Sequence, residues 1–69
     1  MTKQEIEERL DKNPFQPFRI KTSDGKHYDV TNPDLVVAMA TRVFIALPEN
    51  RWTLIALGQV TGLEGLAAA

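Results

Sequence analysis

The chain has 69 residues, a formal net charge of −1 and no cysteine. A chain this short forms one domain and buries only roughly 60% of its unfolded surface, so its core alone gives marginal stability. The lack of cysteine excludes disulfides and zinc–thiolate sites, and self-association is the remaining common way to bury more surface. The near-neutral charge excludes a bulk electrostatic attraction to nucleic acid or to anionic membranes.

The composition is that of an ordinary globular protein, with 43% hydrophobic and 25% charged residues. No apolar run is long enough to span a bilayer, and the N-terminus has the pattern of a polar helix rather than of a signal peptide. We therefore expect a single cytoplasmic domain over residues 1–69 and no membrane partner.

The first predicted element is a short helix over about residues 2–12. Thr2 and Glu5 have the spacing of a capping box at its start. Ile6 and Leu10 lie four positions apart and form a narrow apolar stripe. Since two apolar residues cannot hold so short a helix in water, we expect it to dock on a sheet through this stripe.

Residues 18–30 predict a β-hairpin with one apolar and one polar face, because apolar and polar residues alternate in both arms. A two-residue loop at Asp24-Gly25 would mix charged and apolar side chains on both faces. A three-residue loop, with Gly25 in the left-handed region, keeps the faces apart. It predicts these cross-strand pairs: Phe18 with Val30, Arg19 with Asp29, Ile20 with Tyr28 and Lys21 with His27.

Two further strands are predicted at residues 35–40 and 43–47, which are apolar on both faces rather than alternating. The Thr41-Arg42 link between them does not fix their register, because neither residue favours positive φ. In so small a domain one face can meet the core, and the other must meet the helix or another subunit.

The last two predicted strands cover residues 51–57 and 61–64. Pro48-Glu49-Asn50 reads as a three-residue turn, with Pro48 at its first position and Asn50 in the left-handed conformation. This turn predicts the pairs Phe44–Leu54, Ile45–Thr53 and Ala46–Trp52. Two glycines weaken the final strand, which we expect at a sheet edge.

Together with hairpin strands at about 18–22 and 26–31, these elements predict a mainly β (α+β) fold. We expect a short N-terminal helix followed by a five-stranded, strongly bent antiparallel sheet or a small SH3-like or Sm-like barrel. The segment Asp24-Gly25-Lys26-His27-Tyr28 resembles the junction between the first two strands of Sm-like proteins. The whole chain is also similar to a group of small uncharacterised bacterial proteins, on Pro14-Phe15-Gln16-Pro17-Phe18-Arg19-Ile20, Asp24-Gly25 and Pro33. That second resemblance implies no assigned activity.

The resemblance to Sm-like proteins implies RNA binding as an alternative function. Asp29 and Asn32 lie in a region comparable to that of the family's RNA-contacting Asp and Asn. The glycine of the second strand is absent, and Leu57-Gly58-Gln59 lacks the basic residue of the late loop. The candidate nucleic-acid face is the basic stripe on the hairpin, made of Arg19, Lys21, Lys26 and His27.

No catalytic or cofactor motif is visible. His27 is the only histidine, so a transition-metal site would need several clustered carboxylates. Ser23 has no base beside it in the pattern, and no glycine loop matches a phosphate site. An enzyme would also need a pocket of about 300 Å³ or more, which a small barrel seldom has. We therefore expect no enzymatic activity, no cofactor and no metal.

The segments that are apolar on both faces favour a homo-oligomeric assembly or protein-interaction module. Trp52 either fills the core or anchors an interface, since tryptophan is enriched at binding hot spots. The expected partners are a second copy of the chain and possibly another protein. The candidate interface residues are Val36, Ala38, Phe44, Trp52 and Leu54.

Overall fold

The structure is a computed structural model that describes residues 1–66; residues 67–69 of the predicted domain lie outside the described part. The elements in chain order are α1 (Lys3–Leu10), β1 (Phe18–Thr22), β2 (His27–Val30), β3 (Val36–Ala38), β4 (Arg42–Leu47), β5 (Arg51–Ala56) and β6 (Val60–Gly65). Two 3-10 helices, η1 (Pro33–Leu35) and η2 (Leu57–Gln59), connect β2 to β3 and β5 to β6.

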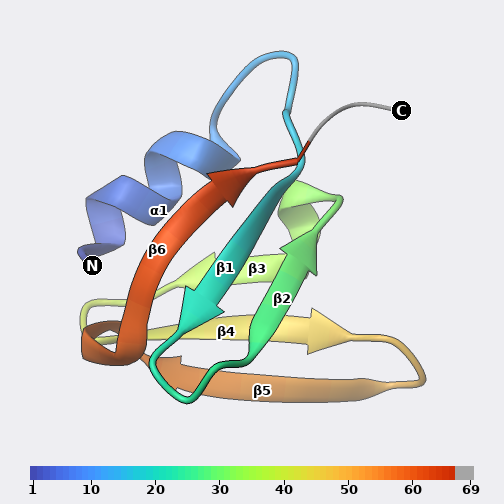
Figure 1. Ribbon diagram of the computed structural model, residues 1–69. Coiled ribbons are helices and arrows are strands. Elements are labelled where there is room, and N and C mark those ends of the chain that lie inside the picture. Colours follow the sequence, from blue (N-terminus) through green and yellow to red (C-terminus); the bar gives the residue numbers. More distant parts are fainter. Residues whose placement is uncertain (67–69) are drawn as a thin grey trace.

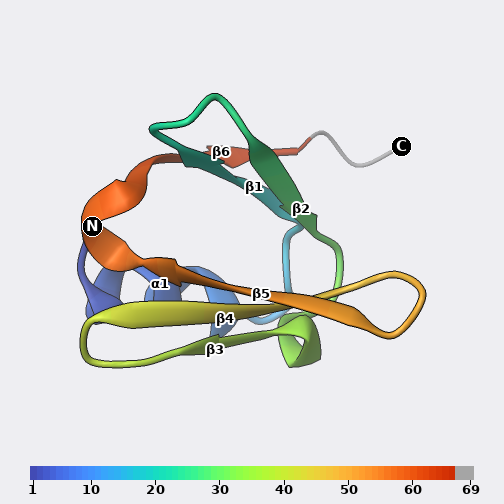
Figure 2. The same ribbon diagram turned by 90° about the horizontal axis from the view of Figure 1, so that it is seen from below.

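The strands form two three-stranded antiparallel sheets, in the orders β2-β1-β6 and β3-β4-β5. The sheets lie in two layers whose strands cross, as Figures 1 and 2 show from two directions. The prediction of a mainly β fold with one short helix is confirmed. The prediction of five strands in one bent sheet or barrel was wrong, because residues 1–66 form six strands and no closed barrel. A barrel would need both edges of one sheet to pair with edges of the other, and no strand of β2-β1-β6 pairs with a strand of β3-β4-β5.

The predicted register of the first hairpin is confirmed at all four pairs. Gly25 has φ +83°, in the left-handed region that the three-residue loop requires. The Asp24 carboxylate accepts hydrogen bonds from the Thr22 hydroxyl and, at 3.1 Å, from the Lys26 N–H, which closes the turn. Local turn chemistry therefore sets which residues of β1 and β2 share a face.

The predicted register between β4 and β5 is also confirmed. The turn differs from the expected one, since Glu49 (φ 63°) and Asn50 (φ 61°) are both left-handed. The pairing of β3 with β4, which the sequence left open, places Val37 opposite Phe44. This register determines which side chains of β3 face the core.

The core lies between the two sheets, and α1 docks on it through Ile6, which is fully buried. Thr2 caps the helix as predicted, since its hydroxyl oxygen accepts the Glu5 N–H at 3.2 Å. Leu10 is half-buried against the core, so the predicted stripe is the docking face. The remaining core residues come from every strand and from η2: Phe18, Ile20, Val30, Val36, Val43, Ile45, Ile55, Leu57 and Val60.

We expect Gly25→Ala to destabilise the fold by about 1 kcal/mol, because an L-residue is disfavoured in the left-handed region. A Cβ at this position would meet no atom within 4 Å, so the cost comes from the backbone alone. Gly58→Ala is the matched control, since its added Cβ is equally free and its φ is not left-handed. Urea unfolding of the two variants checks this, and equal stabilities would contradict the assigned turn.

Candidate functional site

The outer face of the β3-β4-β5 sheet is the most apolar exposed surface among the described residues. We define it by Val37, Phe44, Trp52 and Leu54, which neighbour one another through the pairs Val37–Phe44 and Phe44–Leu54 and the diagonal contact of Phe44 with Trp52. The exposed fractions are 55% for Val37, 63% for Trp52 and 41% for Leu54, while Phe44 is half-buried. Large exposed apolar side chains that are contiguous mark a surface for interaction.

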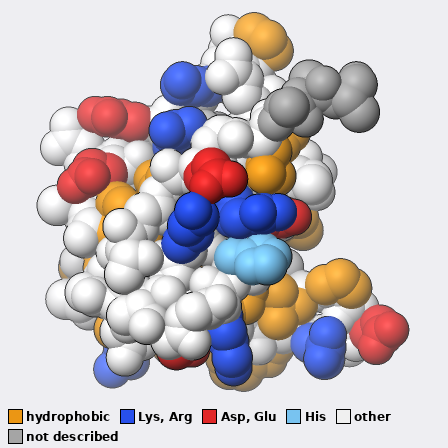
Figure 3. Space-filling model, in the orientation of Figure 1, with side chains coloured by type: hydrophobic (Ala, Val, Ile, Leu, Met, Phe, Trp, Pro, Cys, Tyr) orange, Lys and Arg blue, Asp and Glu red, His pale blue; other side chains and the backbone are white. Residues whose placement is uncertain are grey.

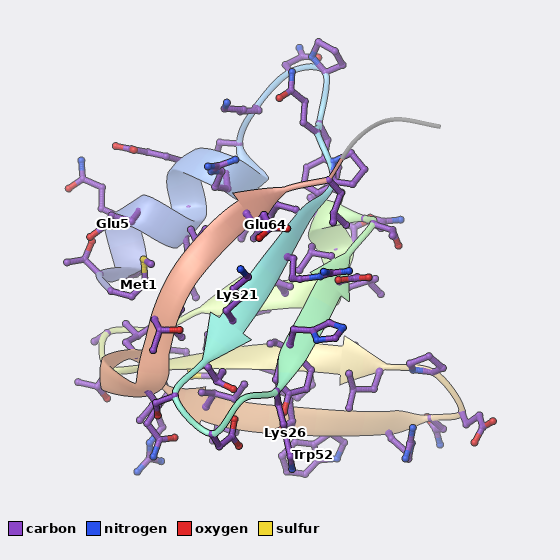
Figure 4. The ribbon with its side chains drawn as sticks, in the orientation of Figure 1. Met1, Glu5, Lys21, Lys26, Trp52 and Glu64 are labelled. Atoms are coloured by element: carbon purple, nitrogen blue, oxygen red, sulfur yellow. The ribbon has the colours of Figure 1, made fainter. Side chains whose placement is uncertain are left out.

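Strand alternation explains why these side chains are exposed. Val43, Ile45 and Ile55 point to the opposite side of the same strands and are buried in the core. The rings of Phe44 and Trp52 stack with centroids 5.8 Å apart and planes inclined by 25°. This stacking holds Trp52 in place on the surface, and Figure 4 shows it projecting from β5 at the lower border of the molecule.

The structure divides the predicted interface residues between the two faces of this sheet. Phe44, Trp52 and Leu54 share the outer face, as the register predicted. Val36 pairs with Ile45 on the core side and is only 5% exposed, and Ala38 packs against the core as well. Neither residue is on the face that carries Trp52.

Val37 is the outer-face residue that sequence reasoning missed. In an unbroken run of apolar residues, neither member of a neighbouring pair is marked as the outward one. The cross-strand pair of Val37 with Phe44 was the missing signal, and it depends on a register that Thr41-Arg42 did not reveal. The corrected surface therefore has Val37 in place of Val36 and Ala38.

The predicted basic stripe lies on the outer side of the first hairpin, where acidic side chains are mixed with it (Figure 3). The Arg19 Nε donates to Asp29 at 2.7 Å, and the Lys21 Nζ lies 2.7 Å from a Glu64 carboxylate oxygen. Figure 4 shows Lys21 and Glu64 extending from the neighbouring strands β1 and β6. Among residues 1–66, Lys26 and His27 form no ion pair within 4 Å, so the stripe has two of its four groups free of a carboxylate partner.

Asp29 and Asn32, which the Sm resemblance links to RNA, both have local partners. The hydrogen bond from Arg19 holds the pKa of Asp29 below its ordinary value. The Asn32 side-chain oxygen accepts the Asp34 N–H at 2.9 Å and caps η1. Each side chain thus has a structural role in the free chain.

Two hollows lie between β2 and the β4–β5 hairpin, where the sheets do not join. The larger, of about 460 Å³, is lined by His27, Tyr28, Asp29, Thr31, Leu35, Ala46, Leu47 and Pro48. It is a hollow open at the surface, whereas the expectation concerned the volume inside a small barrel. Its one carboxylate, Asp29, is paired with Arg19. The smaller hollow, of about 220 Å³, borders β5 at Thr53, Leu54 and Ile55.

Within residues 1–66, no group of three or more histidine, aspartate or glutamate side chains is arranged to hold a metal ion. In the same part of the chain, no helix is long and apolar enough to cross a membrane. Comparisons with known protein families, with curated protein sequences and with solved structures found no match. The predicted SH3-like or Sm-like assignment therefore stays a prediction.

The Arg19–Asp29 pair predicts a loss of stability in acid. Because the folded state lowers the pKa of Asp29, the unfolded state binds more protons below about pH 5. The stabilisation is complete above the ordinary pKa of an aspartate and is lost as pH falls through the lowered one. We expect Asp29→Asn to flatten the acid limb of unfolding free energy against pH, measured in urea.

Asp11→Asn is the control for this experiment, since Asp11 is exposed and lies outside the ion pairs of residues 1–66. The effect will be modest, because the Asp29 side chain is 42% exposed and water screens the pair. Identical acid limbs for Asp29→Asn and the unmodified chain would show that the pair has no role in acid stability.

Proposed function

We propose that this chain is a non-enzymatic homo-oligomeric assembly module, in which the part of the β3-β4-β5 sheet around Trp52 contacts a second copy. The observation that supports this function is the 63% exposure of Trp52 within an apolar surface. Tryptophan held rigidly on a surface is the residue type most enriched at binding hot spots. Its stacking on Phe44 reduces the side-chain entropy that binding would otherwise cost.

The apolar side chains of this face can pack against the same side chains of a second copy. None of its four defining side chains is charged, and the charged residue of β4 on this face, Arg42, lies at the first position of the strand. A standard interface buries about 800 Å² of each partner, which is roughly one sixth of the 4738 Å² exposed by this chain. Association would also supply the additional burial that a short, cysteine-free chain lacks.

The proposal predicts that Trp52→Ala weakens self-association by about 2 kcal/mol or more, which corresponds to a rise in Kd of roughly thirtyfold. Light scattering after size exclusion, over a range of protein concentrations, measures this change. An oligomer mass that is the same for both proteins at every concentration would overturn the role of Trp52.

Two controls separate association from folding. Trp52→Phe keeps an aromatic ring against Phe44 and should retain most of the association. Because Trp52 is exposed, Trp52→Ala should leave the circular dichroism spectrum of the folded chain unchanged. A monomeric unmodified chain at all concentrations would overturn the proposed function itself.

RNA binding through Arg19, Lys21, Lys26 and His27 is the alternative that the Sm resemblance suggests. Since carboxylates pair with Arg19 and Lys21, we expect no retention of single-stranded RNA at low ionic strength. Gel-shift assays over a salt series test this expectation. Retention that weakens as salt rises would favour the alternative, because phosphate contacts release counterions.

A further inference from the structure

We infer that two copies of the chain join through the free edges of β5, which pair antiparallel with Trp52 opposite Leu54 of the second copy. The inference rests on the proposed self-association and specifies its geometry. The two β3-β4-β5 sheets would then form one continuous sheet of six strands around a two-fold axis.

The two edges of the β3-β4-β5 sheet differ in what covers them. The helix α1 contacts β3 and lies beyond it, whereas no described helix or strand lies beyond β5 (Figure 1). The smaller hollow separates the same strand from the turn between β1 and β2, whose residues Ser23, Asp24 and Lys26 line its other side.

β5 also lacks the features that protect other edges from pairing. β2 has only four residues, and His27 and Asp29 are polar and exposed. β6 contains two glycines, and its pairing with β1 shifts register between Lys21 and Thr22. β5 has six residues in unbroken register with β4, without proline or glycine, and its one charged residue is at the first position. A long, flat and apolar edge of this kind is a template for another strand.

The hydrogen-bonding groups on this edge can be assigned from the pairing with β4. The Leu57 N–H, just beyond β5, donates to the Thr41 carbonyl at 2.9 Å and so points toward β4. Backbone groups alternate in direction along a strand, so those of Thr53 and Ile55 also point toward β4. The N–H and C=O groups of Trp52 and Leu54 therefore point to the free edge, where the described residues provide no strand partner.

One antiparallel register joins these free groups and also pairs the apolar side chains. With Trp52 opposite Leu54 of the second copy, both residues exchange backbone hydrogen bonds, and both side chains stay on the outer face. The relation is reciprocal, so the aromatic–aliphatic pair forms twice. Thr53 then lies next to the two-fold axis, opposite Thr53 of the second copy. These two residues form a pair that exchanges no backbone hydrogen bonds.

The charges permit this arrangement. Arg51 is the one charged residue of β5, and antiparallel pairing places the two copies of Arg51 four residues apart along the strands. That separation is about 14 Å, which exceeds the Debye length of about 8 Å at physiological ionic strength. A parallel pairing in register would instead bring the two guanidinium groups together.

The absence of native cysteine makes disulfide trapping a direct test. In a Thr53→Cys variant, the two Cα atoms across the axis would lie about 4.5 Å apart, within the range of roughly 4.4–6.8 Å that a disulfide spans. We expect mild oxidation to convert most of the chain to a covalent dimer at concentrations where light scattering shows dimers. Arg51→Cys is the matched control on the same strand, because its sulfur atoms would lie too far apart to bond.

Each outcome decides a different proposal. Trapping of Thr53→Cys several-fold above Arg51→Cys supports the β5 register. A dimeric mass with no excess trapping at Thr53→Cys overturns this register and leaves the proposed self-association in place. A monomeric mass at all concentrations overturns both proposals.

Hydrogen exchange of the unmodified chain tests the same geometry without substitution. On going from dilute to concentrated protein, the amides of Trp52 and Leu54 should exchange several-fold more slowly, since they gain partners. The amide of Thr53 already points toward β4 and should change less. If the amides of Trp52 and Leu54 exchanged at the same rate in dilute protein and in a sample that light scattering shows to be dimeric, pairing through β5 would be contradicted.

Discussion

The structure depends on one constraint, which is that a single small core must serve two three-stranded sheets. Phe18 and Ile20 from one sheet and Val43 and Ile45 from the other fill the space between the layers, and Ile6 from the helix completes it. These side chains cover the inner face of each sheet. Residues 1–66 form no layer over either outer face, so the composition of those faces decides how they interact with solvent or a partner.

The two outer faces differ in chemistry. On the β2-β1-β6 sheet, Arg19 pairs with Asp29 and Lys21 pairs with Glu64, so charges of opposite sign balance locally in a solvated surface. The outer face of the β3-β4-β5 sheet instead carries Trp52 beside Phe44 and Leu54. Water solvates the first surface well and the second poorly. This contrast is the physical basis for assigning self-association to one sheet and not to the other.

The strands β2 and β5 each have one edge that pairs with no other strand of residues 1–66. A closed barrel would pair both edges of one sheet with edges of the other, but no strand pairs across the two sheets among residues 1–66, and two hollows separate them near β2 and β5. α1 covers the β3 side. The edge of β5, which carries Trp52 and Leu54, is thus the place where a second copy could pair, and this links the proposed function to a specific strand.

Local sequence determined two of the three hairpins of this protein. Alternation in β1 and β2 with Gly25 in the turn set the first register, and the turn at Pro48-Glu49-Asn50 set the register of β4 with β5. Only the tertiary structure decided the rest. The pairing of β1 with the distant β6 separated the strands into two sheets, and the pairing of β3 with β4 turned Val36 inward and Val37 outward. In an unbroken run of apolar residues, the sequence does not show which side chains face the core. The exposed residues of the run are known only once pairing with a neighbouring strand fixes the register.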